Sequence, residues 1–196
     1  MIRIQDIKGI ILDWGGVVCQ DPAPGFVRYI SAKLSCPAEH LAPVLLRHLV
    51  FFQRGGSEED FWKYVCDDLH IPLPPGPLWR EALTAIYAHN HPLITWAEKK
   101  HEQGYLIALL TNTEKPARDF HLSLGYDFFD ARIFSCDIQI AKPDRIIYEK
   151  TAQILGLKPE ECLMIDDKPE NIWGAQQAGM QGLLYKNHQD LIILFP

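Results

Sequence analysis

The sequence has no long hydrophobic run. Its longest apolar stretches cover residues 9–12, 106–110 and 191–195, far short of the roughly 18 residues that a membrane-spanning helix needs. The first residues, Met1–Asp6, also lack the basic and apolar segments and the small-residue cleavage site of a signal peptide. We therefore expect a soluble protein in the cytoplasm that has no membrane partner.

Basic charge is scarce and scattered along the chain. There are 19 Lys and Arg against 25 Asp and Glu, which gives a net charge of −6, and no basic cluster is richer than Lys99–Lys100. A protein that binds nucleic acid normally carries a basic stripe or patch. The scarcity argues against a nucleic-acid partner and leaves a small molecule as the expected ligand, bound by a monomer or a homodimer.

Cysteine is used sparingly and without a pattern. The five cysteines are widely spaced, and none forms a Cys-x-x-Cys pair, which argues against a zinc site and against a disulfide framework. A content of 47% apolar and 22% charged residues excludes disorder for the bulk of the chain. We expect one or two folded domains with reduced cysteines.

Short apolar runs alternate with helix-length patterns in most of the chain. The runs that predict strands cover residues 7–13, 105–111, 131–135, 162–166 and 181–185. The predicted helices cover residues 93–103, 115–124, 144–155 and 169–178. This order predicts the α/β class, with a Rossmann-like parallel sheet that has helices on both faces.

Residues 22–90 follow a different pattern, with helical periodicity and no convincing strand. Ser57, followed by three acidic residues, marks a helix start, and the proline-rich segment 72–77 predicts a rigid break between two helices. We expect a core domain made of residues 1–20 and 92–196. Residues 21–91 would form an inserted all-helical cap that can cover a site on that core.

Polar residues follow or end several of the predicted strands. They are Asp13 with Gly15 and Gly16, Thr111 with Asn112, and Asp166 with Asp167; Lys142 precedes the helix that leads to the fourth strand. In a parallel sheet these strand ends meet at one edge. Carboxylates suit Mg²⁺, whereas a lysine, a hydroxyl and free backbone N–H groups suit phosphate. The set therefore predicts phosphoryl transfer, with Asp13 as the nucleophile.

These segments resemble the motifs of the haloacid dehalogenase-like hydrolase superfamily. In order, they are Ile10–Val17, Leu109–Asn112, Ala141–Pro143 and Met164–Asp167, followed by Asn171 and a Gly-Ala-x-x-Ala-Gly run that begins at Gly174. The resemblance spans nearly the whole chain. The helical insertion between the first two motifs is similar to the cap of the haloacid dehalogenase and phosphatase branch.

The resemblance implies a role for each matching residue. Asp13 would be the nucleophile and a Mg²⁺ ligand, and the backbone carbonyl of Gly15 would also bind the metal. Asp166 and Asp167 would complete the metal site, Asp167 as the more direct ligand, with Asn171 orienting this acidic pair. Thr111 and Asn112 would hold the phosphoryl oxygens beside the Gly16 backbone. Lys142 would neutralise both the nucleophile and the phosphate.

One position departs from the resemblance. Most phosphatases of the superfamily have an aspartate two residues after the nucleophile as general acid and base, and this chain has Gly15 there. Such catalysis is typically worth about 10²- to 10⁴-fold. The donor would then be the substrate, water or a cap residue such as Asp21, His40, His48 or Asp60. The loop resembles that of α-D-glucose-1-phosphate phosphatases, which implies a Mg²⁺-dependent hydrolase acting on a sugar phosphate or another small phosphorylated metabolite.

Three other functions remain open. A metal-free dehalogenase would use the same nucleophile, but the adjacent Asp166 and Asp167 would repel each other without a cation. A phosphonate-cleaving hydrolase would need a Schiff-base lysine in the cap, where Lys33 and Lys63 are available. A catalytically degenerate member would bind a phosphorylated ligand or a protein partner without turnover, which the glycine at position 15 makes conceivable.

Overall fold

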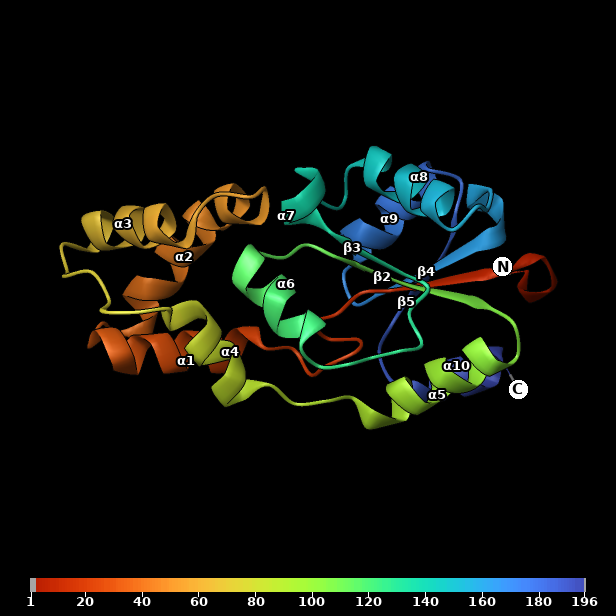
Figure 1. Ribbon diagram of the computed structural model, residues 1–196, viewed down its shortest axis with the longest axis horizontal. Helices are drawn as coiled ribbons and strands as arrows, with labels where there is room; N and C mark the ends of the chain where they lie inside the picture. Colours follow the sequence, from red (N-terminus) through yellow and green to blue (C-terminus); the bar gives the residue numbers. More distant parts are fainter. Residues whose placement is uncertain (1–2, 196) are drawn as a thin grey trace.

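The computed structural model describes residues 3–195 and shows an α/β layer beside a group of helices (Figure 1). The α/β layer contains a five-stranded sheet in the order β3-β2-β1-β4-β5. The strands are β1 (Gly9–Leu12), β2 (Leu106–Thr111), β3 (Ala131–Phe134), β4 (Cys162–Asp166) and β5 (Gln181–Leu184). All four strand pairs are parallel. The five predicted strands and the α/β class are confirmed.

Both faces of the sheet are covered, which explains why its strands are apolar at nearly every position. On the central strand β1, Ile10 packs in a cluster with residues of α5 (His91–Glu102) and α10 (His188–Leu194). Its neighbour Ile11 packs in a second cluster with residues of α8 (Arg145–Ile154) and α9 (Pro169–Gln177). Successive side chains point to opposite faces, and Figure 1 shows these two helix pairs on opposite sides of the sheet.

Four predicted helices of the α/β layer are confirmed as α5, α6 (Lys115–Leu122), α8 and α9. Two helices have no counterpart among the predicted elements, namely α7 (Ser135–Ile138) and α10. Single 3₁₀ turns occupy Ile4–Asp6 and Pro159–Glu161. The helix α7 has only four residues, too few to display a periodic pattern.

The segment between β1 and α5 is helical, as expected. It forms α1 (Ala23–Leu34), α2 (Ala38–Gln53), α3 (Glu58–Leu69) and α4 (Leu78–Ile86), which we call the helical insertion. The Ser57 hydroxyl accepts a hydrogen bond from the Asp60 backbone N–H at 3.0 Å and so caps α3. The proline-rich segment 72–77 separates α3 from α4. The domain limits at residues 21 and 91 stay a prediction.

The helical insertion has an aromatic core of its own. Phe52, Phe61 and Trp79 pack with ring centroids 4.6 to 5.1 Å apart, within the range of favourable aromatic pairs. The Glu58 carboxylate accepts hydrogen bonds from the Trp62 indole N–H and from the backbone N–H of Trp79, so it joins α3 to the start of α4. These contacts fix the position of Trp79.

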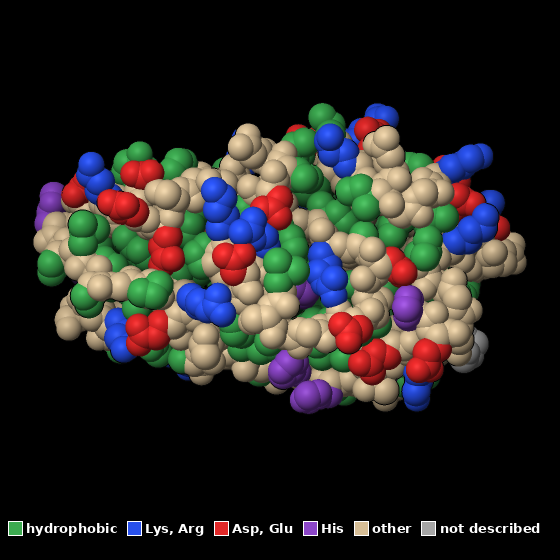
Figure 2. Space-filling model, in the orientation of Figure 1, with side chains coloured by type: hydrophobic (Ala, Val, Ile, Leu, Met, Phe, Trp, Pro, Cys, Tyr) green, Lys and Arg blue, Asp and Glu red, His purple; other side chains and the backbone are tan. Residues whose placement is uncertain are grey.

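None of the helices within residues 3–195 is long and apolar enough to span a bilayer. On the face shown in Figure 2, acidic and basic side chains are interspersed rather than segregated. The carboxyl ends of β1, β2 and β4 lie at the edge of the sheet where the functional residues are predicted.

Candidate active site

The parallel register brings the predicted residues of three strands to one edge of the sheet. Asp13 follows β1, Thr111 ends β2, and Asp166 ends β4, and both β2 and β4 pair with β1. The Asp13 backbone N–H donates to the carbonyl of Ile165 at 3.0 Å, which continues the ladder one residue past the strand. The nucleophile candidate is therefore fixed by the sheet rather than carried on a free loop.

Lys142 joins the two carboxylates at the centre of this edge. Its Nζ lies 2.8 Å from Asp13 Oδ1 and 2.6 Å from Asp166 Oδ2. The three side chains are only 1%, 8% and 0% exposed, respectively. A buried charge is tolerated when it is paired and hydrogen-bonded, and here one cation is shared by two anions.

Burial and charge act in opposite directions on these groups. Burial raises the pKa of Asp13; Lys142 opposes this effect and the neighbouring Asp166 adds to it. Burial alone would lower the pKa of Lys142, but Asp13 and Asp166 more than offset it and raise that pKa. Burial, followed by the charge of Asp166, also raises the pKa of Asp167. Lys142 is thus held firmly in its charged form, and the net charge at this edge of the sheet is negative.

Asn112 holds the loop that carries Lys142. Its side-chain N–H donates to the Lys142 carbonyl at 2.8 Å, and its side-chain oxygen accepts from the Lys142 backbone N–H at 2.7 Å. The amide is thereby engaged with the protein. Contact of Asn112 with a phosphoryl group stays a prediction.

Asp166 is anchored on several sides. Its two oxygens accept from the Asn171 side chain at 2.9 and 3.0 Å, and one also accepts from the Lys168 backbone N–H at 2.9 Å. Together with the Lys142 contact, these bonds leave the carboxylate little freedom. Asn171 therefore contacts the first member of the acidic pair, where it fixes the orientation of Asp166.

Three carboxylates converge in a way that fits a divalent cation. Asp13, Asp166 and Asp167 each offer an oxygen, and these oxygens lie within 4.8 Å of one another. Asp167 Oδ1 is buried without a hydrogen-bond partner. A Cβ on Gly16, whose φ is +81°, would stand 2.4 Å from Asp167 Oδ2. The loop after Asp13 can therefore approach Asp167 this closely only with glycine at position 16. An all-oxygen, negatively charged donor set is what Mg²⁺ prefers.

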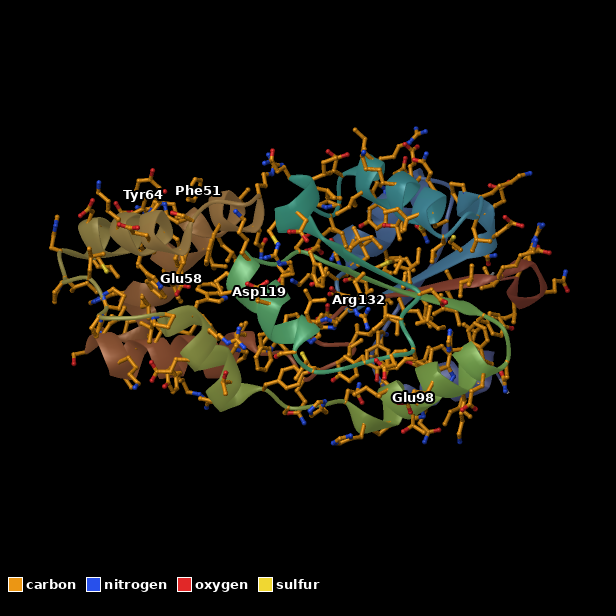
Figure 3. The ribbon with its side chains drawn as sticks, viewed as in Figure 1. Phe51, Glu58, Tyr64, Glu98, Asp119 and Arg132 are labelled. Carbon is orange, nitrogen blue, oxygen red and sulfur yellow. The ribbon has the colours of Figure 1, made fainter. Side chains whose placement is uncertain are left out.

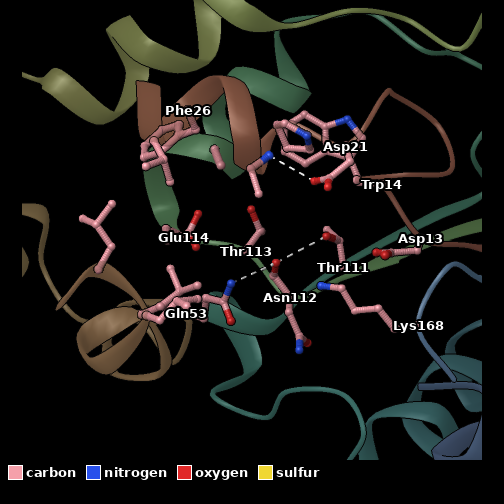
Figure 4. Close-up of a pocket in the computed structure, with 18 of the residues that line it drawn as sticks. Asp13, Trp14, Asp21, Phe26, Gln53, Thr111, Asn112, Thr113, Glu114 and Lys168 are labelled. Carbon is pink, nitrogen blue, oxygen red and sulfur yellow. Dashed lines mark hydrogen bonds between the residues drawn. The ribbon is translucent and has the colours of Figure 1, made fainter. Parts of the chain in front are cut away.

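A cavity of about 910 Å³ opens beside these carboxylates (Figure 4). Its lining from the α/β layer includes Asp13, Gly15, Thr111, Asn112, Lys142, Asp167 and Asn171, and that from the helical insertion includes Phe26, Leu45, Leu49, Gln53, Trp79 and Leu83. The volume lies within the usual range for ligand pockets. Trp14 lines the cavity as well, with its indole packed against Phe120 and His121.

The structure separates the four residues considered as substitute proton donors. Asp21 lines the cavity, where its carboxylate accepts from the Ala23 backbone N–H at 3.0 Å. His40, His48 and Asp60 do not line it; His48 is bound to Asp68, and Asp60 to Ser57. Asp21 is the member of this group that shares the cavity with Asp13.

The two lysines considered for a Schiff base lie outside the cavity. Lys33 pairs with Glu81 at 2.5 Å, with both side chains about half exposed, and Lys63 is exposed on α3. Neither lines the cavity. The lysines that do so are Lys142 and Lys168, both from the α/β layer.

Sequence reasoning did not single out Glu114 or Lys168. Both line the cavity, as does Gln53 at the end of α2. Glu114 precedes a Lys-Pro pair at a helix start, where an acidic residue is ordinary. No local pattern could reveal its burial, because Gln53 and Trp79, which lie against it, come from the helical insertion.

Comparison with known proteins supports the resemblance to the haloacid dehalogenase-like hydrolase superfamily. An 80-residue region, 40% of the chain, is 35% identical to "Pyrophosphatase PpaX" of Bacillus cereus, and it spans 37% of that relative's length. A HAD family enzyme of Bacteroides thetaiotaomicron, solved with magnesium and inorganic phosphate, superimposes with a TM-score of 0.78 at 18% identity, covering 97% of this chain and all of that one.

Two further solved structures have the same fold. A predicted HAD-like hydrolase of Porphyromonas gingivalis has a TM-score of 0.76 at 23% identity, with 97% of this chain and 98% of that one covered. The L-2-haloacid dehalogenase of Xanthobacter autotrophicus has a TM-score of 0.64 at 17% identity, covering 90% and 76%. The family model described as "haloacid dehalogenase-like hydrolase" matches residues 7–179. The chain therefore belongs to the haloacid dehalogenase-like hydrolase family.

Proposed function

We propose that this protein is a Mg²⁺-dependent phosphomonoester hydrolase that acts on a small phosphorylated metabolite through an aspartyl-phosphate on Asp13. The observation that carries the proposal is the shared contact of Lys142 with Asp13 and Asp166, beside the partnerless Asp167 oxygen. A carboxylate beside a fixed cation and a surplus of acidic oxygens suits attack on a metal-bound phosphate. The helical insertion is the proposed cap.

Asp13 would act as the nucleophile. One carboxylate oxygen forms a bond to phosphorus while the bond from phosphorus to the leaving alcohol oxygen breaks, and that oxygen takes up a proton. Water then attacks the phosphorus of the aspartyl-phosphate, which releases phosphate, restores the Asp13 carboxylate and frees one proton. Lys142, 2.8 Å from Asp13 Oδ1, keeps the carboxylate oriented and offsets the charge of the phosphoryl group in both steps.

Asp13, Asp167 and the Gly15 carbonyl would hold Mg²⁺, with Asp166 supporting them from its anchored position. When bound, the ion would neutralise the phosphoryl oxygens and orient them toward the nucleophile. The backbone N–H groups after Thr111 and at Gly16 would donate hydrogen bonds to the same phosphoryl oxygens. A Bacteroides thetaiotaomicron structure of this fold, solved with magnesium and inorganic phosphate, supports this assignment by analogy.

The leaving alcohol needs a proton, and the residue that usually supplies it is Gly15 here. Asp21 is our candidate for this donor, because its carboxyl lines the same cavity as Asp13. A donor reaching in from the start of the cap would act only when the cap lies over the substrate, which also limits access of water.

The substrate class that we propose is a sugar phosphate or a compound of similar size. Of the other functions, a metal-free dehalogenase fits less well, because Asp13, Asp166 and Asp167 would share a single buried lysine. A phosphonate-cleaving reaction would need a lysine from the cap, and neither Lys33 nor Lys63 lines the cavity. Binding without turnover is the remaining alternative.

The test is phosphate release from a panel of sugar phosphates, nucleotides and p-nitrophenyl phosphate, with Mg²⁺ and with EDTA. Asp13→Asn should lower kcat by about 10⁴-fold or more, as loss of a nucleophile does. Asp167→Asn should raise the Mg²⁺ concentration for half-maximal rate by at least about tenfold. Asp127→Asn, at an exposed position outside the cavity, is the matched control and should behave as wild type.

Two results would overturn the proposal. If Asp13→Asn shows metal-dependent turnover at the rate of the Asp127→Asn control, Asp13 is not the nucleophile. Saturable Mg²⁺ binding with no phosphate released from any ester would instead favour a binding protein without turnover.

A further inference from the structure

Glu114 is a buried carboxyl inside the cavity for which the proposed mechanism has no use. It directly precedes α6, close to the end of β2, and its residue is only 5% exposed. Its side chain does not cap α6, although an acidic residue at a helix start often does. In Figure 4 it faces the cavity from the same strand end as Thr111 and Asn112, on the side toward the helical insertion.

No residue that the structure describes forms an ion pair with this carboxyl. Burial is the main effect and raises the pKa of Glu114 from 4.5 to about 7; hydrogen bonding from its own backbone N–H and from the side chains of Gln53 and Trp79 offsets only part of this rise. The Gln53 side-chain N–H also donates a long bond of 3.5 Å to the carbonyl of Asn112. A buried acceptor with so little compensation is costly to the fold.

A second polar group on the same wall is poorly paired. The Trp79 indole N–H is buried and makes no hydrogen bond of normal geometry with any described residue, and Trp79 lines the cavity beside Glu114. Buried polar groups are paired in most proteins. The Glu114 acceptor and the Trp79 donor thus lie side by side on a cavity wall with no well-formed bond from the indole N–H, an arrangement that a ligand group able to bond to both would complete.

The chemistry of this wall selects the ligand group. A hydroxyl donates one hydrogen bond and accepts others, so it can donate to Glu114 and accept from the Trp79 indole at once. An ammonium group could only donate, and a carboxylate could only accept and would be repelled. The rest of this side of the cavity is apolar, formed by Phe26, Leu45, Leu49 and Leu83, and suits the carbon face of a ring.

We propose that Glu114, the Trp79 indole and Gln53 form a leaving-group subsite that binds a hydroxyl of the substrate alcohol. This inference rests on the proposed phosphomonoester hydrolase function and narrows its substrate class to esters of a hydroxylated alcohol. The subsite joins both parts of the molecule, since Glu114 comes from the α/β layer and the other two residues come from α2 and α4. A fitting leaving group would therefore hold the cap in place over Asp13.

The first experiment compares two six-membered ring esters, glucose 1-phosphate and cyclohexyl phosphate; they differ in the ring hydroxyls and also in the ring oxygen, the hydroxymethyl group and the acidity of the leaving alcohol, so the measured quantity is the change of their ratio between protein variants. We expect wild type to favour the hydroxylated ester in kcat/KM. In Glu114→Leu the ratio of the two kcat/KM values should fall by about 10- to 100-fold, the effect of losing a hydrogen bond to a charged group. Glu114→Gln, which keeps an acceptor, should lose less.

Glu98→Gln is the matched control, because Glu98 is exposed on α5, well away from Glu58 and the rest of the helical insertion (Figure 3). The control should keep the wild-type ratio. A ratio that is unchanged in folded Glu114→Leu and Glu114→Gln would overturn the subsite while leaving the proposed hydrolase intact.

A second measurement does not depend on turnover. The indole N–H resonance of Trp79, assigned by its absence in Trp79→Phe, should shift when glucose 1-phosphate is added to Mg²⁺-loaded protein and shift much less with cyclohexyl phosphate. The difference should disappear in Glu114→Leu. If neither ester is hydrolysed but the shift is seen, the proposed function fails and the subsite stands; no shift with either ester overturns the subsite.

Discussion

The buried carboxyls of Asp13 and Glu114 line the same cavity, and their surroundings differ. At the strand ends, Asp13 and Asp166 share Lys142, and Asp166 also accepts from Asn171. On the wall toward the helical insertion, Glu114 has no ion-pair partner among the described residues; its own backbone N–H, Gln53 and Trp79 are the hydrogen-bonding groups that act on it, and burial raises its pKa to about 7. At the strand ends, the buried negative charge is balanced by the side chain of Lys142. At Glu114, no charged side chain among the described residues balances it.

The difference matches the two proposed roles, namely reaction at Asp13 and ligand recognition at Glu114. Lys142 and Asn171, the side chains that bond to Asp13 and Asp166 among the described residues, come from the α/β layer, so these contacts do not require the helical insertion. Glu114 is buried by residues of α2 and α4, so its environment depends on how the insertion sits. A reaction centre needs a fixed charge arrangement, whereas a selective subsite gains from polar groups that only the correct ligand satisfies.

The largest effect should come from removing the shared cation. Lys142→Met leaves two buried carboxylates facing each other without compensation, and breaking a buried pair in this way typically costs about 3–5 kcal/mol. We expect a loss of that size in the free energy of unfolding, measured by urea denaturation in EDTA. Lys150→Met, at an exposed position on α8, should stay within about 0.5 kcal/mol of wild type.

A Lys142→Met protein as stable as Lys150→Met would contradict the comparison. It would mean that the strand-end carboxylates do not depend on their lysine and that the two regions are compensated alike.

The next effect concerns the uncompensated region and depends on pH. The unfolded chain ionises Glu114 near 4.5, whereas the folded protein keeps its proton up to about 7. Between these values the folded state binds more protons, so the contribution of Glu114 to stability falls as pH rises. Glu114→Gln removes this dependence. Relative to wild type, the variant should gain about 2 to 3 kcal/mol between about pH 5 and pH 8.

Urea denaturation of both proteins at the two pH values measures this change, because other titrating groups cancel in the difference. Glu170→Gln is a suitable control, since Glu170 lines the cavity but is exposed. A wild-type minus Glu114→Gln difference that does not change with pH would show that Glu114 is compensated as well as Asp166 is.

The fold was largely predictable because its pattern is local. Each strand of the sheet is a short apolar run, and Ser57 and the prolines of 72–77 mark helix limits by their own chemistry. The helix α7 has four residues and shows no period, and α10 ends in an apolar stretch that also suits a strand. Where the pattern was short or ambiguous, tertiary packing decided.

The candidate site was predictable only in part. Asp13, Thr111 and Asp166 meet because parallel strands bring their ends to one edge, and that rule works from sequence. The clamp of Asn112 on Lys142 joins residues 30 positions apart, and the burial of Glu114 needs side chains from α2 and α4. No local property of these residues contains that information, because it arises only when segments far apart in the sequence pack together.

The smallest effect tests whether the helical insertion contributes stability without chemistry. Ser57→Ala removes the hydroxyl that accepts from the Asp60 N–H at 3.0 Å and caps α3, a loss typically worth about 1 kcal/mol. We expect that decrease in the free energy of unfolding, with Ser57→Asn recovering most of it because its side-chain oxygen can accept the same bond. Phosphate release should keep its wild-type kcat, since Ser57 does not line the cavity. A fall in kcat in proportion to the loss of stability would contradict this separation. It would show that the structure of α3 affects catalysis at the strand-end carboxylates.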